Sequence, residues 1–287
     1  MRQAINNVNV EGILNEVDLN VKVDSSNREY ISGKVILLVD QMCCGKPDRN
    51  EVAVNVFAYK LTKAGKNNPA FESASQLLQN GVSVAACGDE ASADRYRVTG
   101  CNLSTNEFTA QDGRHVVYPT IRASFFNKVT KDFNPTATFE QEIVIGSINE
   151  EIVNDDPTGR LLVQGIIVGY NDRVDSITYV VEDENAVNHI RNYWSADATV
   201  KVWGKVRSTV STVTRSSSEE VGFGEAPTRT YQKTTREFVI TSGSPQAYDD
   251  DLAFNINEVR AALIAKKNAA SAAPAAPVKS PAMNRGF

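Results

Sequence analysis

The feature of this sequence that most constrains its fold is a β-strand pattern that occurs twice. Alternating polar and apolar residues predict strands over 8–13, 30–39, 51–59 and 95–103, and again over 144–150, 160–168, 176–181, 199–207 and 236–241. Short helices are predicted at residues 70–79, after Pro69, and at residues 185–193, after an acidic turn. In both halves the helix falls between the third and the fourth strand, so the chain has one plan repeated.

Short sequence matches occur in the same order in the two halves. The pattern V-x-G-x-φ-N-E, in which φ is apolar, covers residues 10–16 and 144–150. Residues 30–36 and 162–168 share two apolar residues, a polar residue, a glycine, any residue and an apolar pair. Ser-Ala-Asp at 92–94 and 195–197 precedes [RK]-V-x-G at 97–100 and 201–204, and then Ser-Thr at 104–105 and 208–209. These matches predict a duplication.

We therefore predict an all-β protein with two tandem OB-fold-like five-stranded barrels, each with a short helix between strands 3 and 4. Glycines inside several strands suit the tight bends of a small closed barrel. Five strands arranged in this way are typical of the OB-fold, whose barrel face binds oligonucleotides or oligosaccharides. Another small β-sandwich is the alternative, since periodicity does not distinguish the two. The predicted domains are residues 1–135 and 136–247.

A C-terminal helix over residues 248–267 is predicted after the second unit. Leu252, Ile256, Val259 and Leu263 have helical spacing, and three aspartates precede them. Residues 268–287 are rich in alanine and proline and are predicted to form a flexible tail without a core.

Composition and motifs exclude several classes of protein. The formal net charge of -5 argues against a uniformly basic protein that coats duplex DNA. No apolar run approaches the roughly 20 residues of a membrane span, and no signal-peptide core is present, so we expect a cytoplasmic protein. The 2 histidines and the absence of GxSxG, HExxH and phosphate-loop motifs predict no enzyme and no cofactor. Cys43, Cys44, Cys87 and Cys101 lack CxxC spacing, so we expect free thiols and no metal site.

The strongest binding pattern lies in the predicted strand at residues 199–207. Its period of two places Lys201, Trp203, Lys205 and Arg207 on one face, and Val200, Val202, Gly204 and Val206 on the other. An indole flanked by cations suits a single strand, whose bases stack on the ring while its phosphates meet the charges. Alternatively, Trp203 is covered by the C-terminal helix or by the neighbouring barrel.

The first unit has a similar pattern. Phe57 and Tyr59 share one strand face with Asn55, and Arg95 and Arg97 share another. Tyr30 and Lys34 point outward if Ile31, Val35 and Leu37 point inward. Lys60, Lys63 and Lys66 follow in a loop, where they either track a phosphate backbone or serve only solubility.

A long polar connection is predicted over residues 208–233. Its Arg215, Arg229, Tyr231 and Lys233 are candidates to close over a bound strand, whereas Glu219 and Glu220 oppose such contact.

From about residue 5 to residue 245, the chain resembles the bacteriophage-type single-stranded-DNA-binding proteins with tandem OB-folds. The resemblance rests on the V-x-G-x-φ-N-E and S-A-D…[RK]-V-x-G…S-T repeats, on the basic and aromatic strand faces and on the Ala/Pro-rich tail. It implies sequence-tolerant binding of single-stranded DNA in replication, recombination or repair, in the cytoplasm of a bacterial host. Replication or recombination proteins are the further partners that it implies.

Two other classes of function stay open. A viral structural protein of a tail or capsid would also be duplicated, all-β and acidic, but would show no salt-dependent affinity for DNA. A carbohydrate-binding β module would use the exposed aromatic residues without needing the lysines and arginines beside them.

Overall fold

Strands make up most of the computed structural model, which describes residues 1–110, 114–216 and 228–272. The strands are β1 (Asn6–Val23), β2 (Glu29–Cys43), β3 (Lys46–Tyr59), β4 (Arg95–Thr109), β5 (His115–Ala123), β6 (Phe125–Lys128), β7 (Thr136–Val153), β8 (Asp156–Val168), β9 (Val174–Val181), β10 (Thr199–Ser216) and β11 (Thr228–Gly243). The helices are α1 (Pro69–Asn80), α2 (Val84–Cys87), α3 (Glu184–Tyr193) and α4 (Ile256–Ala272), with a 3-10 turn η1 (Tyr170–Asp172). Among the described residues, no helix combines the length and apolarity of a transmembrane segment.

The first five strands pair in a closed ring. β1 pairs with β2 and β2 with β3, β3 runs parallel to β5, and β5 pairs with β4, which returns to β1. The short strand β6 pairs antiparallel with β4 at the edge of the sheet. Helix α1 lies between β3 and β4 in the sequence and buries Phe71, Ala74 and Leu77. Its start is set by Asn68, whose side chain accepts a hydrogen bond from the Ala70 amide, and by Pro69 at the first helical position.

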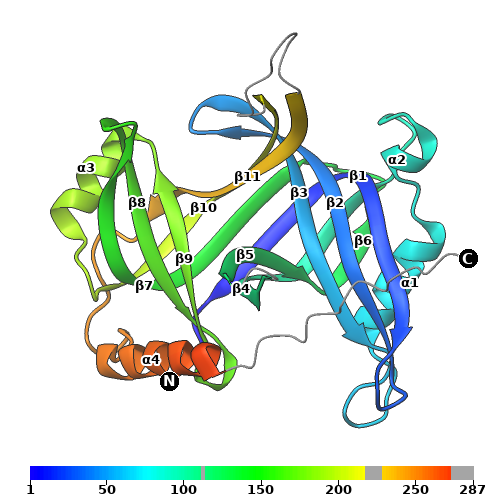
Figure 1. Cartoon of the computed structure of the whole chain (residues 1–287), viewed down its shortest axis with the longest axis horizontal. Helices are drawn as coiled ribbons and strands as arrows, with labels where there is room; N and C mark the ends of the chain where they lie inside the picture. The colour runs from blue at the N-terminus through cyan, green and yellow to red at the C-terminus, as the bar shows by residue number, and fades with distance from the viewer. Residues whose placement is uncertain (111–113, 217–227, 273–287) are drawn as a thin grey trace, which may run out of the picture.

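The last five strands form a second ring with the same order. β7 pairs with β8 and β8 with β9, β9 runs parallel to β11, and β11 pairs with β10, which returns to β7. Helix α3 lies between β9 and β10, in the position that α1 has in the first ring. The repeated glycines occupy corresponding strands, with Gly33 in β2 and Gly165 in β8, and Gly100 in β4 and Gly204 in β10. Figure 1 shows the two rings side by side.

The sequence predictions of an all-β chain with a C-terminal helix are confirmed. The inward faces are also as predicted, because Ile31, Val35, Leu37, Val52, Val54, Val200, Val202 and Val206 are all fully buried. One ladder joins the rings: β1 pairs with β7 from Asn6–Gln141 to Glu11–Thr136, within one continuous sheet. The division into domains at residues 135 and 247 stays a prediction.

The C-terminal helix begins later and ends later than predicted. Residues 249–253 form turns, Phe254 is buried, and α4 begins at Ile256. The Asn255 side chain accepts a hydrogen bond from the Asn257 amide, which satisfies a free donor at the helix start. Residues 268–272 continue the helix because alanine has the highest helix propensity. The rest of the predicted tail, residues 273–287, lies outside the described residues.

The predicted polar connection at 208–233 is mostly strand. β10 and β11 pair continuously from Gly204–Ile240 to Ser216–Thr228, so residues 208–216 and 228–233 form the two arms of a hairpin. Threonine occurs repeatedly in both arms and valine in the first, and their branched side chains favour extended backbone. Residues 217–227, with Glu219 and Glu220, lie outside the described residues. The backbones of Arg215, Arg229, Tyr231 and Lys233 therefore belong to the ladder.

Gly204→Ala should destabilise the protein by about 1–3 kcal/mol, the usual cost of overpacking a core. A methyl group at Gly204 would meet the Val239 carbonyl oxygen and the Phe139 ring far inside contact distance. Gly146→Ala is the matched control, because its nearest neighbours would lie at 3.4 Å, an ordinary contact. Urea unfolding followed by tryptophan fluorescence measures both variants. Equal stabilities of the two variants would contradict this packing argument.

Candidate nucleic-acid interface

Three aromatic rings gather on the outer face of β2 and β3. The register pairs Tyr30 with Tyr59 and Ser32 with Phe57, so these side chains share one face. The ring centroid of Phe57 lies 5.3 Å from that of Tyr30 and 5.3 Å from that of Tyr59. Phe57 is 61% exposed although its strand is otherwise well packed. We call Tyr30, Phe57 and Tyr59 the aromatic cluster; the exposed Phe57 ring, with the half-buried tyrosines beside it, can stack with other planar groups.

Arg28 extends the aromatic cluster at its outer edge. Its guanidinium carbon lies 4.4 Å from the centroid of the Tyr59 ring, and it forms an ion pair with Asp24 at 2.8 Å. The hydrogen bond that the Arg28 guanidinium donates to Asp24 raises the pKa of Arg28, while the hydrogen bond from the backbone amide of Arg28 is the main cause that lowers the pKa of Asp24. Arg28 therefore packs on the Tyr59 ring from the turn between β1 and β2.

A row of polar side chains crosses four strands beside the aromatic cluster. Lys34 on β2 pairs with Asn55 on β3, Asn55 pairs with Arg122 on β5, and Arg122 pairs with Asn102 on β4. Neighbours within each strand are buried, so this row faces outward. Neither Lys34 nor Arg122 forms an ion pair with any residue that the structure describes. The row thus places two cations without an ion-pair partner among the described residues next to the aromatic cluster.

The lysines after β3 stand in an exposed loop. Lys60 forms an ion pair with Glu29 at 2.8 Å. The loop folds back through a bridge between Leu61 and Asn67, which leaves Lys63 and Lys66 exposed. Within the described part of the chain, these two lysines make no ion pair. Both lysines can therefore contact a polyanion, as the prediction of a phosphate-binding loop requires.

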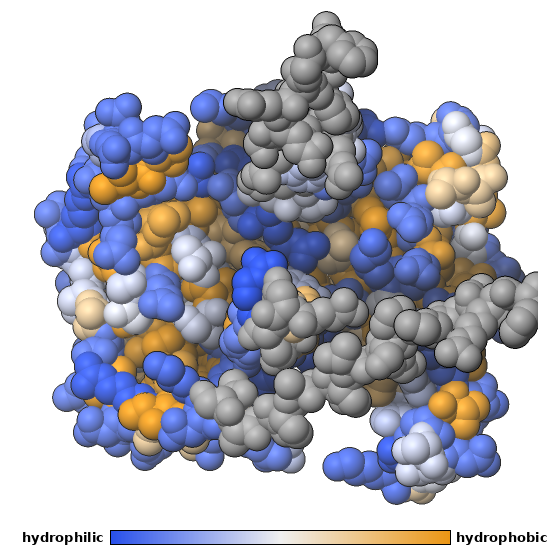
Figure 2. Space-filling view, in the orientation of Figure 1, coloured by the Kyte–Doolittle hydropathy of each residue, from blue (hydrophilic) through white to orange (hydrophobic). Residues whose placement is uncertain are grey.

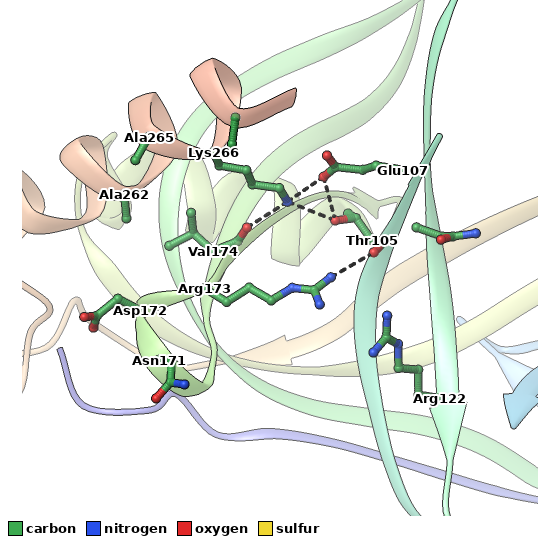
Figure 3. Close-up of a pocket in the computed structure, with 12 residues that line it drawn as sticks. Thr105, Glu107, Arg122, Asn171, Asp172, Arg173, Val174, Ala262, Ala265 and Lys266 are labelled. Atoms are coloured by element: carbon green, nitrogen blue, oxygen red, sulfur yellow. Dashed lines mark hydrogen bonds and ion pairs between the residues drawn. The ribbon is translucent and has the colours of Figure 1, made fainter. Parts of the chain in front are cut away.

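Arg122 also lines a groove of about 660 Å³ between the first ring, the η1–β9 segment and α4. Figure 3 shows Arg122 apart from the other bonded side chains, whereas Lys266 reaches from α4 to Glu107 and Thr105. Figure 2 shows strongly hydrophilic residues in the middle of the molecule, between the two rings. The groove continues the polar row away from the aromatic cluster.

The other cations of the groove are already paired. Lys266 forms ion pairs with Glu107 at 2.6 Å and with Asp175 at 3.0 Å, and Arg173 pairs with Asp175 at 3.3 Å. Burial alone would raise the pKa of Asp175, but hydrogen bonds from Thr105 and Lys266 outweigh it and lower that pKa. These contacts tie α4 to both rings, so we assign Lys266 and Arg173 to structure.

Arg95 and Arg97, predicted to bind DNA, lie on the part of β4 that pairs with β1 and β6. Arg97 forms an ion pair at 2.6 Å with Glu11, which is buried, and this contact raises the pKa of Arg97. The guanidinium of Arg95 lies 5.0 Å from the centroid of the Phe133 ring. The structure therefore separates both arginines from the aromatic cluster.

The predicted row on β10 keeps its shared face, but its cations have partners. Lys201 forms an ion pair with Glu140 at 2.5 Å, and its ammonium lies 4.9 Å from the centroid of the Trp203 ring. Lys205 donates a hydrogen bond at 2.5 Å to the carbonyl oxygen of Met42, in the first ring. Trp203 is 37% exposed, less than Phe57. Much of this row contacts protein, contrary to the expectation of an open cationic track.

Arg207 departs furthest from the prediction. Its side chain is only 18% exposed and contacts Glu182 at 2.8 Å, Glu237 at 3.2 Å and Asp48 at 3.4 Å. The bond to Glu182 is the main cause that raises the pKa of Arg207 and lowers that of Glu182. A guanidinium neutralised by three carboxylates does not attract phosphate, so we remove Arg207 from the candidate site.

Sequence reasoning missed several residues at this surface. They are Arg28, Asn102 and Arg122, together with Phe108 and Tyr118, whose exposed rings lie 6.1 Å apart on β4 and β5. A signal for Arg122 was present, because it alternates with the apolar Ile121 and Ala123. Pro119 obscured it, since proline within a run argues against a central strand.

The fold is that of a single-stranded DNA binding protein known from crystal structures. The wild-type protein from Thermus aquaticus superposes with a TM-score of 0.51 at 9% identity, over 88% of this chain and 98% of that chain. A deletion variant of the same protein gives a TM-score of 0.51 and 9% identity, over 87% and 98%. No curated protein matches the sequence. The family model described as YorF matches residues 4–274, so the chain belongs to the YorF family.

Proposed function

We propose that this chain binds single-stranded DNA with little sequence preference, through the outer face of the first ring. The observation that carries the proposal is the aromatic cluster, with its exposed Phe57 ring, beside cations at Lys34, Lys63, Lys66 and Arg122 that form no ion pair with the described residues. Bases of any sequence stack on such rings, while the cations follow the phosphates. The fold shared with the Thermus protein supports the same function.

Each ring is, in this proposal, an OB-fold, and residues 1–135 and 136–247 are tandem domains. The pairings of both rings and the helix after the third strand support this assignment. The first ring dominates binding, because β8 and β9 correspond to β2 and β3 but carry Gln164 and Thr178 on their exposed face. Neither side chain offers a stacking surface.

The biological role that we propose is protection of single strands in phage DNA replication, recombination or repair. The protein then acts in the cytoplasm of a bacterial host, beside replication or recombination proteins, without catalysis and without a cofactor for binding. The resemblance of the repeats to bacteriophage-type binders supports this role.

The test is a fluorescence anisotropy titration of labelled oligo-dT and of duplex DNA at two salt concentrations. We expect tighter binding of the single strand and a loss of affinity as the salt concentration rises, since binding releases counterions from the phosphates. Binding that is indifferent to salt and to strandedness would favour a viral structural protein or a carbohydrate-binding module.

Arg122→Ala should weaken binding of oligo-dT and of other single-stranded sequences by a similar factor, and should reduce the slope of log affinity against log salt by about one. The physical reason is the loss of one phosphate contact at the groove. The salt series above measures the slope. Arg191→Ala, in an exposed ion pair with Glu150 on the second ring, is the control and should leave the slope unchanged. An unchanged slope in Arg122→Ala would remove the groove from the DNA path.

A further inference from the structure

Two adjacent cysteines and a glutamate from different rings meet at one point. Cys43 and Cys44 end the β2–β3 hairpin of the first ring, and Glu182 directly follows β9 in the second ring. The thiol sulfurs and a carboxylate oxygen all lie within 4.8 Å of one another. Cys43 is buried and Cys44 is half-buried, and both are free thiols. Sequence spacing did not predict this meeting, because Glu182 is distant from the cysteines along the chain.

The hairpin turn holds Cys44 in an unusual conformation. Cys43 pairs with Lys46, so Cys44 and Gly45 form a two-residue loop in which both have positive φ, 48° and 75°. Asn, Asp or Gly usually occupies the first position of such a loop, because a side chain there is strained. A cysteine accepts that strain here, and its thiol sulfur lies within 4.8 Å of a Glu182 carboxylate oxygen. Turn propensity does not explain a cysteine at position 44, so we attribute its presence there to its thiol group.

The surroundings of the three groups carry an excess of negative charge. Arg207 contacts Glu182, Glu237 and Asp48, and Arg160 contacts Glu237 and Glu151. Four carboxylates thus share two guanidinium groups, which leaves two uncompensated negative charges in the ion-paired network. A cation next to Glu182 would be attracted by this excess, although Arg207 itself opposes it.

We propose that Cys43, Cys44 and Glu182 bind a thiophilic divalent cation of the zinc type. Two sulfurs and one carboxylate oxygen are a ligand set that Zn²⁺ and Cd²⁺ accept, with a fourth position left for water. Zn–S bonds of about 2.3 Å place tetrahedral ligand atoms about 3.8 Å apart, so closure requires movements of about an ångström. The cation would join the hairpin of the first ring to the second ring.

Binding must displace protons from both thiols. Burial is the main cause that raises the pKa of Cys43, and it raises the pKa of Cys44 to about 12, so both thiols are neutral in the metal-free protein. Metal coordination deprotonates cysteine ligands and releases the protons to solvent. Glu182 keeps its charge, because the hydrogen bond from Arg207 lowers its pKa.

The test is a titration of the reduced full chain with CdCl₂, followed through the ultraviolet thiolate-to-cadmium band, and with ZnCl₂ against a chromophoric chelator. We expect one equivalent to bind and the thermal midpoint to rise with the metal concentration. Cys44→Ser should lose the cadmium band and weaken Zn²⁺ binding by about a hundredfold or more, since even second-shell changes cost 10–100-fold.

Cys87→Ser is the matched control, because Cys87 is exposed and lies outside the cluster. It should bind both metals like the unmodified chain. Glu182→Gln should also weaken Zn²⁺ binding. If this variant unfolds because the contact with Arg207 is lost, Cys44→Ser by itself tests the metal site. Absence of a cadmium band in the folded unmodified chain, or full binding by Cys44→Ser, would overturn the proposal.

Discussion

Phe57→Ala should weaken the binding of oligo-dT by about 5- to 150-fold, because stacking on an aromatic side chain contributes about 1–3 kcal/mol per base. Phe57 is the most exposed ring of the aromatic cluster and is in contact with both of its neighbours. Removing an exposed ring costs little core packing, so the variant should unfold at nearly the same denaturant concentration. The loss of affinity is then a loss of stacking and not of fold.

Anisotropy titrations at one salt concentration measure this effect, with two comparison variants. Tyr193→Ala removes an exposed ring at the end of α3 and should leave affinity unchanged. Trp203→Ala should have a smaller effect than Phe57→Ala, because the Trp203 ring is less exposed and lies close to Lys201. A larger loss in Trp203→Ala would return the main binding site to β10, where the sequence showed its strongest binding pattern.

Arg207→Ala should lower the free energy of unfolding by about 3 kcal/mol, the low end of the effect of breaking a buried ion pair, because its side chain is still 18% exposed. Asp48, Glu182 and Glu237 would then face one another without their common cation. The three carboxylates come from both rings, so their repulsion acts on the contact between the rings. Nearby Gln41 and Asn50 hydrogen-bond to the backbone of β10 and would lose their alignment.

Urea unfolding measures the change, and Arg191→Ala serves as the control. Arg191 and Glu150 form an exposed pair, for which a loss of less than about 1 kcal/mol is expected. DNA affinity of the folded Arg207→Ala variant should stay within a few-fold of the unmodified chain. A stable variant with a selective loss of affinity would show that Arg207 contacts phosphate after all.

Local patterns predicted the strands because their cause is local. Alternation at Ile31, Val35 and Leu37 identified the buried face of β2, and the same period placed Tyr30 and Lys34 outward. The repeats predicted equivalent elements, and the corresponding strands pair in the same order in both rings. The polar composition of residues 208–233 predicts a loop, but pairing between the two arms of the hairpin makes most of this segment strand.

The sequence by itself determined which side chains leave each strand on which face, since backbone geometry fixes that period of two. It did not determine what those side chains meet. Arg207 and Asp48 are 159 residues apart in the chain, and Arg122 adjoins Asn55 only because β3 and β5 pair in parallel. Charge pairing depends on distances of a few ångströms between segments remote in sequence. The tertiary structure alone therefore decided which cations are neutralised and which stay free beside the aromatic cluster.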